Sequence, residues 1–317
     1  MFQLTQAELQ GFVAETGFQK NPLEKFLRLL NVLAVLHRNP LLKEFFVLKG
    51  GTALNLFHHG LLRLSVDIDL NYIHQIARDQ MFLEKPAINS EIEKLFAADY
   101  AISIEKNEYA LTQFVLHYRT MSGSKDMLKI EINYLHRLPI LKPEVRTIKR
   151  FGMKVSYPCL AVEELLAGKI IALLSRYTPR DLYDVYQAAN SSLPYDSQSL
   201  RSLIIFYGLI SRLSVFEIFQ TAFERITAND LRRHLLPLLA KGKLPERAVM
   251  VAAVEKFLKP FVTLTDAESE AIKAFYSGGA LAAEIFFTDS GMQSKVKLAP
   301  SLLWKMQNIH REFARSA

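Results

Sequence analysis

The stretch from Arg63 to Asn71 constrains the fold most, because polar and apolar residues alternate strictly along it. A β-strand has a period of two, so this pattern predicts a strand with one aliphatic and one polar face. The polar face would carry Arg63, Ser65, Asp67, Asp69 and Asn71. Two carboxylates two positions apart on a strand point the same way and can bind one or two hard cations such as Mg²⁺.

A glycine pair precedes this strand, in Gly50-Gly51-Thr52, between a predicted strand at 45–48 and a predicted helix at 52–58. Glycines let the backbone turn tightly and approach a ligand closely. The start of the helix offers unpaired N–H groups and the positive end of its dipole to a phosphate, and Thr52 adds a hydroxyl donor. A phosphate cradle beside the Asp67 and Asp69 pair indicates phosphoryl or nucleotidyl transfer.

The rest of the pattern predicts an α+β fold. We expect helices before residue 40, further strands near 101–105, 110–118 and 127–134, helices at 161–174 and 180–189, and a linker at 190–194. Beyond the linker the chain is predicted to be almost wholly helical. The expected architecture is a mixed β-sheet flanked by helices in a domain of residues 1–190, followed by a helical C-terminal domain of residues 191–317.

Composition limits the location and the partners. The single cysteine, Cys159, excludes an internal disulfide and a thiolate zinc cluster, and it suits a reducing cytoplasm. No apolar run approaches the ~18 residues of a membrane span, and the first ten residues lack signal-peptide features, so a cytoplasmic protein without membrane association is expected. The formal charge of +7 favours a nucleic-acid or nucleotide partner, with an ordinary solvated surface as the alternative.

Two segments, LKGGTALNL and RLSVDIDL, resemble the AbiEii/MenT group of nucleotidyltransferase-fold toxins, within the DNA polymerase β-like nucleotidyltransferase superfamily. Farther along, EELLAGK at 163–169 and RDLYD at 180–184 are similar to that group's later Lys and Arg-Asp-x-x-Asp motifs. The resemblance extends from about residue 45 to 190. It implies a nucleotidyltransferase-like sheet and a reaction that uses an NTP with Mg²⁺ or Mn²⁺.

The resemblance also implies a role for each matching residue. Nucleotide and phosphate binding would fall to Gly50, Gly51, Thr52, Arg63, Ser65 and Arg180; metal binding to Asp67, Asp69 and, as a third carboxylate, Glu131; and catalysis to Asp67, Asp69, Lys169 and Asp181. Several of these side chains could instead have an ordinary structural role. Glu131 could pair with a nearby cation, and Lys169 could be a surface residue whose ammonium reaches solvent. Asp181 and Asp184 could serve the helix dipole, and Arg63 could form an ordinary ion pair.

These implications define an expected function. The chain would transfer a nucleoside monophosphate from an NTP to an acceptor hydroxyl, with RNA, at a tRNA 3′ end, as the expected acceptor. It would be the toxin of a type IV toxin–antitoxin system and would have an AbiEi-like antitoxin as partner. Two alternatives stay open, a transferase that adds AMP or UMP to a protein and a non-catalytic module that binds nucleotides or a partner.

Overall fold

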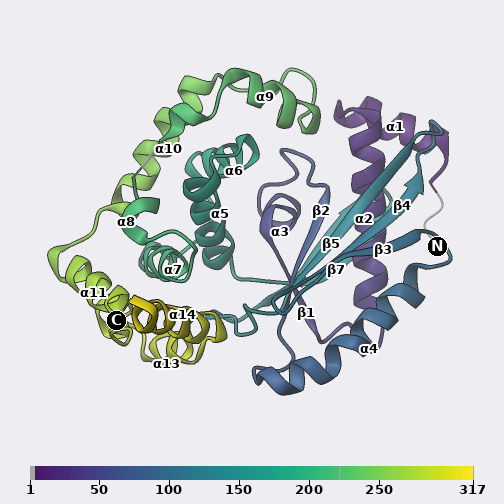
Figure 1. Cartoon of the computed structure of the whole chain (residues 1–317). Helices are drawn as coiled ribbons and strands as arrows, with labels where there is room; N and C mark the ends of the chain where they lie inside the picture. Colours follow the sequence, from purple (N-terminus) through teal and green to yellow (C-terminus); the bar gives the residue numbers. More distant parts are fainter. Residues whose placement is uncertain (1–3, 221, 317) are drawn as a thin grey trace. The chain divides into compact units, whose positions relative to one another are not determined.

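The computed structural model describes residues 4–220 and 222–316 of the 317-residue chain (Figure 1). Contacts between residues divide the chain into two compact units. The first unit consists of Met1–Arg137, Pro143–Leu160 and Arg232–Leu244, and the second of Leu138–Lys142, Ala161–Leu231 and Pro245–Ala317.

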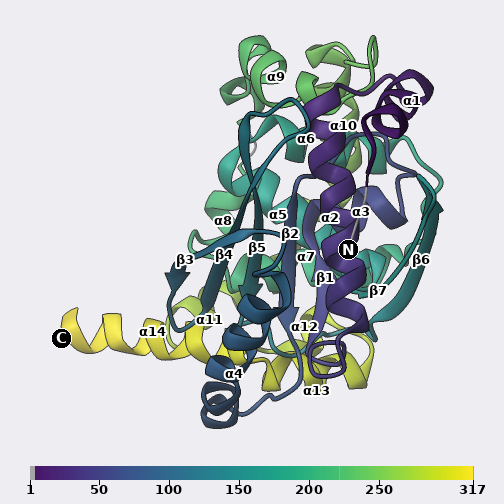
Figure 2. The same ribbon diagram turned by 90° about the vertical axis from the view of Figure 1, so that its right-hand side faces the viewer.

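The first unit is built on a seven-stranded mixed sheet with the order β3-β4-β5-β2-β1-β7-β6. Its elements are α1 (Gln6–Thr16), α2 (Lys20–Arg38), β1 (Phe46–Lys49), α3 (Gly50–Phe57), β2 (Asp67–Tyr72), α4 (Arg78–Phe96), β3 (Ala101–Asn107), β4 (Leu111–Arg119), β5 (Lys125–Asn133), β6 (Glu144–Arg150), β7 (Met153–Cys159) and a 3-10 turn, η2 (Leu236–Leu238). The pairs β1–β7 and β2–β5 are parallel, and the other four pairs are antiparallel. Figure 2 shows β3 and β6 at the two edges of the sheet. The predicted α+β class with a mixed sheet is confirmed.

The core of this unit lies on the aliphatic face of the sheet. Ile68 and Leu70 on β2 are fully buried there, as the alternating pattern predicts. Helix α2 packs on this face because its buried residues recur at helical spacing; they include Leu23, Phe26, Leu27, Leu30 and Leu33. From α4, Glu84 accepts a hydrogen bond from Tyr72 at the end of β2 (2.5 Å). The opposite face of the sheet carries the polar residues Asp67, Asp69 and Asn71 of β2.

The strand predicted from residue 63 begins only at Asp67, so that prediction is too long at its start. Leu61 has a positive φ of 65°, and the chain beyond it pairs elsewhere. Arg63 forms an isolated antiparallel bridge with Leu239, and the N–H of Leu64 donates to the carbonyl of Leu238. Arg63 and Ser65 therefore do not extend the strand face of Asp67 and Asp69, contrary to the sequence-based expectation.

Two strands were not predicted. β6 and β7 form an antiparallel hairpin that continues the sheet beyond β1, with Leu48 of β1 aligned to Cys159 of β7. β6 is an edge strand and is mostly exposed, whereas β7 alternates between buried and less buried residues. The hairpin therefore extends the sheet by two strands beyond the region that the sequence patterns predicted.

The second unit is helical. Its elements are α5 (Val162–Arg176), α6 (Pro179–Ala189), α7 (Ser197–Leu209), α8 (Val215–Ile218), η1 (Phe223–Arg225), α10 (Arg247–Val262), α11 (Asp266–Tyr276), α12 (Ala283–Phe286), α13 (Ser290–Leu298) and α14 (Pro300–Ser316), while α9 (Ala228–His234) spans the boundary with the first unit. Contacts group α5 and α6 with the later helices. The domain boundary expected at residue 190 stays a prediction. Among the described helices, none combines the length and apolar character that a membrane crossing requires.

A buried carboxyl group joins α5 to the segment Leu138–Lys142 of the same unit. Oε1 of Glu164 accepts a hydrogen bond from the N–H of Leu141 (2.7 Å), and Oε2 accepts one from the hydroxyl of Tyr207 (2.5 Å). Burial raises the pKa of Glu164 to about 7, although both hydrogen bonds oppose the shift. The folded protein thus keeps a proton on this group at a pH where an exposed carboxyl has lost it.

This difference predicts how stability depends on pH. Between the usual pKa of 4.5 and the folded value of about 7, the unfolded chain releases the proton and the folded chain retains it. The free energy of unfolding therefore falls as pH rises through this window, by roughly 3 kcal/mol at ~1.4 kcal/mol per pH unit. Glu164→Gln removes this part of the pH dependence in urea unfolding at several pH values. The matched control is Glu163→Gln on the same helix, and parallel pH profiles for Glu164→Gln and the wild type would contradict the prediction.

Candidate active site

The two acidic residues of β2 share the polar face of the sheet in the first unit. Asp67 and Asp69 are both half-buried, and they alternate with the fully buried Ile68 and Leu70. This is the arrangement that the alternating sequence predicts for the part of the stretch that is a strand. The two carboxylates leave the same side of the same strand.

Gly50 lies directly against one of these carboxylates. It opens α3 with a positive φ of 70°, a conformation that L side chains rarely adopt. A methyl group added at its Cα would overlap Oδ2 of Asp69 and lie 3.1 Å from Cγ. The Asp69 carboxylate therefore lies at the glycine turn and the start of the helix, where backbone N–H groups have no partner within the helix.

Thr52 of α3 connects this helix to β2 by hydrogen bonds. Its buried hydroxyl donates to the carbonyl oxygen of Asp67 (2.5 Å) and lies 2.9 Å from Oγ of Ser65. These bonds hold the first turn of α3 against the start of the strand. The hydroxyl that was expected to donate to a phosphate is thus bonded inside the fold, and a phosphate-binding role for Thr52 stays a prediction.

A polar row crosses the sheet at the level of Asp69. By strand register, Asp69 lies beside Lys49 of β1 on one side and beside Glu131 of β5 on the other, and Glu131 lies beside Gln113 of β4. Laterally paired residues share a face of the sheet, with Cβ atoms about 5 Å apart in antiparallel pairs. The amide of Gln113 donates to Oε1 of Glu131 (2.7 Å). The expected partner of Asp69 on a neighbouring strand is therefore in place, while its role as a metal ligand stays a prediction.

Lys49 is a residue that the sequence analysis missed. It is the last residue of β1, immediately before Gly50, and its register partner is Asp69. A cation at this point lies beside both the carboxylate pair and the glycine turn. The available signal was its position, since Lys49 is a charged residue that ends an otherwise buried apolar strand, Phe46–Lys49.

The carboxylate pair fits a hard divalent cation in its chemistry. Oxygen atoms of one or two carboxylates, completed by substrate phosphates and water, are what Mg²⁺ uses in nucleotide sites. Asn71, the next residue on the same face, is buried, and its Oδ1 lacks a hydrogen-bond partner in the described part of the chain. Over residues 4–220 and 222–316, no group of three or more His, Cys, Asp or Glu could hold a metal ion. The fit is therefore to a cation shared with a substrate.

The second unit brings together the later predicted residues. Nζ of Lys169 on α5 lies 2.7 Å from Oδ1 of Asp181 and 3.0 Å from Oδ2 of Asp184, both on α6, and all three side chains are buried. Lys169 is therefore not a surface residue, and that alternative is wrong. Two buried carboxylates around one ammonium hold it in one place. Arg180 is half-buried in the first turn of α6.

Asp181 has further partners that sequence reasoning missed. Nε of Arg176 donates to Oδ2 of Asp181 (2.7 Å), and so does the hydroxyl of Thr178 (2.7 Å), which also caps α6. Burial raises the pKa of the Asp181 carboxyl, but Lys169 and Arg176 outweigh burial and hold that pKa well below its usual value. Arg176 precedes Asp181 by five residues across a helix boundary, so no helical spacing pointed to this pair.

A mixed sheet with two carboxylates on one strand face, one of them against a glycine turn at a helix start, is the arrangement of a nucleotidyltransferase-type protein. The family model described as "Nucleotidyl transferase AbiEii toxin, Type IV TA system" matches residues 34–271, three quarters of the chain. The chain therefore belongs to the AbiEii family of nucleotidyltransferase toxins of type IV toxin–antitoxin systems, as the motifs suggested.

One solved structure supports the fold, and a second shows weaker similarity. MenT4, a nucleotidyltransferase toxin from Mycobacterium tuberculosis H37Rv, is similar with a TM-score of 0.65 at 17% identity, covering 95% of this chain and 99% of that one. JHP933 from Helicobacter pylori gives a TM-score of 0.49 at 17% identity, with 81% and 98% covered. No curated protein sequence matches the chain.

The contact between Gly50 and Asp69 predicts a specific effect of Gly50→Ala. The added methyl group displaces the Asp69 carboxylate, and a displacement of ~1 Å in a catalytic group costs about 100-fold in rate. We expect NTP-dependent transfer by Gly50→Ala to fall by about that factor.

Gly60→Ala is the matched control, because Gly60 also has a positive φ, 63°, but a Cβ there meets no atom within 4 Å. Both variants strain the backbone by about 1–2 kcal/mol, so both lower the unfolding temperature, while Gly60→Ala keeps its activity. Equal loss of activity in the two variants would show that the Asp69 contact is irrelevant.

Proposed function

We propose that the protein is a Mg²⁺- or Mn²⁺-dependent nucleotidyltransferase that moves a nucleoside monophosphate from an NTP to an acceptor hydroxyl. The observation that carries this proposal is the position of the Asp69 carboxylate against Gly50, with Asp67 on the same strand face. The carboxylate pair can bind the metal of a metal–triphosphate complex, and the start of the neighbouring helix can bind its phosphates.

Different residues of the first unit are proposed to bind the triphosphate and the cation. The N–H groups of Gly50, Gly51 and Thr52 at the start of α3 bind the triphosphate, and the helix dipole adds to this attraction. Lys49 lies beside Asp69 and contributes positive charge to the phosphates. Asp67 and Asp69 hold the cation, and the family resemblance assigns Glu131, the register partner of Asp69 on β5, as a third carboxylate, although the described structure does not gather the three around one metal position.

In the proposed reaction, the acceptor hydroxyl gives its proton to water, its oxygen bonds to the α-phosphorus, and the bond from that phosphorus to pyrophosphate breaks, so that pyrophosphate leaves. When bound, Mg²⁺ or Mn²⁺ neutralises the triphosphate and lowers the pKa of the attacking hydroxyl. On the family resemblance, we assign nucleotide binding to Arg63, Ser65 and Arg180, and catalysis to Lys169 and Asp181. The buried pair with Asp181 supports this role for Lys169, because it fixes the position of the ammonium group.

The proposed acceptor is RNA, at a tRNA 3′ end. The excess of 39 Lys and Arg over 32 Asp and Glu suits a polyanionic acceptor, and the substrates belong to the cytoplasm. Membership in a type IV toxin family supports an AbiEi-like antitoxin as the partner. We assign catalysis to residues 1–190 and selection of the acceptor to residues 191–317.

The central test removes the carboxylates. Asp67→Asn and Asp69→Asn keep side-chain size but weaken cation binding, so each variant should lose at least ~100-fold in transfer from α-³²P-labelled NTPs into total RNA. Wild-type activity should require added Mg²⁺ or Mn²⁺ and stop with a chelator. Asp99→Asn, an exposed change in the same unit, is the control and should transfer label normally. Activity that survives both active-site substitutions would defeat the assignment of the metal site.

The acceptor is identified with the same label. Wild-type protein incubated with lysate and each labelled NTP should yield label that RNase removes and protease leaves. Label that protease removes and RNase leaves would replace the RNA acceptor with a protein side chain. NTP binding that is independent of Mg²⁺ and without turnover would instead indicate a non-catalytic module.

A further inference from the structure

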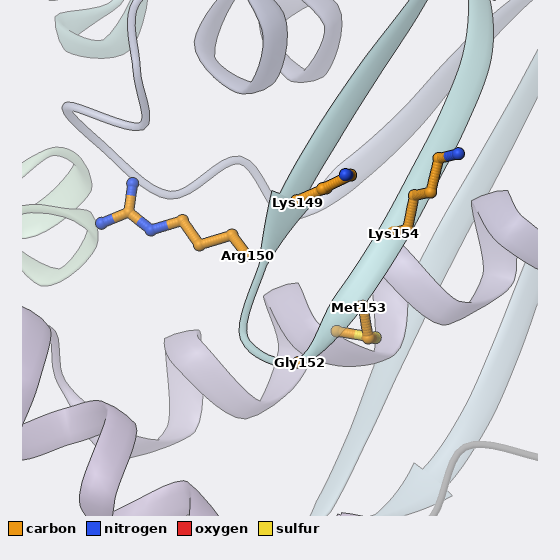
Figure 3. A pocket seen from close by; sticks show the side chains of 5 residues that line it. All are labelled: Lys149, Arg150, Gly152, Met153 and Lys154. Carbon is orange, nitrogen blue, oxygen red and sulfur yellow. The ribbon is translucent and has the colours of Figure 1, made fainter.

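The hairpin of β6 and β7 carries two lysines directly opposite each other. Lys149 and Lys154 are register partners across the antiparallel pair. Figure 3 shows their side chains leaving the hairpin on one side, whereas Arg150 extends the other way. Arg150 donates to the carbonyl of Gly60 (3.2 Å) and lies over the ring of Phe151, so it serves the fold.

The two ammonium groups have no local counter-charge. Both side chains are exposed, and no described carboxylate lies within 4.0 Å of either one. Glu144, which belongs to β6, pairs with Arg146. Like charges directly opposite each other destabilise an antiparallel pair, and an anion between them removes that penalty.

The surroundings have the chemistry of a phosphate site. Lys149, Arg150, Gly152, Met153 and Lys154 line a shallow pocket of about 340 Å³. Next to the lysine pair on the same face, the hydroxyls of Thr147 and Ser156 are 2.8 Å apart. Lysines, hydroxyls and backbone N–H groups are the usual contacts to phosphodiesters, whereas protein partners need aromatic or large apolar anchors.

Register links this surface to the candidate active site. Cys159 aligns with Leu48 on the aliphatic face, so Ser156 and Lys154 lie on the opposite face, which also carries Asp67 and Asp69. Lys154 lies six residues along β7 and two strands across from the Asp69 level, roughly 22 Å away at ~3.3 Å per residue and ~4.8 Å per strand. Only an extended anion can reach both points.

Further positive charge lies in the same unit. Phe151 at the tip of the hairpin packs against Phe12 of α1 (5.1 Å between ring centroids). At the end of α1, the carbonyl of Gly17 accepts a hydrogen bond from the N–H of Lys241 (2.9 Å). Lys241 and Lys243 are exposed there. The unit that carries the hairpin therefore holds two further exposed lysines.

We propose that the β6–β7 hairpin binds the phosphodiester backbone of the RNA acceptor through Lys149 and Lys154. The inference rests on the proposed function for its acceptor and adds the surface that binds it. The contact is independent of RNA sequence, because backbone phosphates carry no base information. It holds the RNA at a fixed distance from the carboxylate pair.

The test measures RNA binding without NTP. A fluorescent RNA stem-loop with a single-stranded 3′ tail is titrated with the full chain carrying Lys149→Gln and Lys154→Gln, and Kd is followed by anisotropy at several salt concentrations. Kd should rise about tenfold, and the slope of log K against log salt should flatten by about 1.5, the effect of two lost phosphate contacts. Lys149→Arg with Lys154→Arg should bind like the wild type.

The control is Lys256→Gln with Lys259→Gln, two exposed lysines on α10 that give the same change in net charge. Equal loss in control and hairpin variants, or no loss in the hairpin variant, overturns the proposal. A third outcome also overturns it. If the hairpin substitutions weaken binding of polyglutamate but leave the Kd for RNA unchanged, the surface binds an acidic protein instead of RNA.

Failure of the proposed function is a separate result. If the wild type transfers no label to RNA but the hairpin lysines still govern RNA affinity, the reaction assignment fails and the binding surface stands. If transfer to RNA occurs and its KM for RNA is unchanged in the hairpin variant, the surface fails and the reaction stands.

Discussion

The candidate site depends on one close approach, in which the Cα of Gly50 lies against the carboxylate of Asp69. This contact requires a residue without a side chain and with a positive φ, and glycine is the residue that meets both conditions readily. It also fixes the distance between the end of β1 and the polar face of β2. The start of α3 and the carboxylate therefore meet because the backbone can come close, and the hydroxyl of Thr52 then locks that helix onto the strand.

In the second unit, buried charges fix the position of a functional side chain, that of Lys169. Lys169, Asp181 and Asp184 are all desolvated, and each alone would be costly to bury. Together they are stable because each ammonium–carboxylate contact is about 3 Å or shorter and Arg176 adds a further cation to Asp181. A charged group fixed in this way cannot swing freely. The first unit positions its acidic groups by backbone geometry, whereas the second positions its lysine by opposing charges.

Local patterns in the sequence predicted what local physics determines. The alternation around Asp67 and Asp69 gave the correct face of β2, because side-chain direction in a strand depends only on the count of residues. The same alternation misplaced Arg63 and Ser65, because pairing with Leu238 and Leu239, far along the chain, takes that segment out of the strand. The hairpin of β6 and β7 was missed because an exposed edge strand has little apolar pattern to read.

Register is the part of the site that no local pattern contains. Lys49, Asp69, Glu131 and Gln113 are neighbours because four strands align at one level, and the alignment of Asp69 with Glu131 joins strands that are far apart in the sequence. Each residue alone is an ordinary polar position on a strand. Aligned, they place a cation, two carboxylates and an amide in one line beside the glycine turn. The chemistry of the site therefore follows from the order and register of the strands, and the mixed topology, in which β2 pairs with both β1 and β5, is what brings that row together.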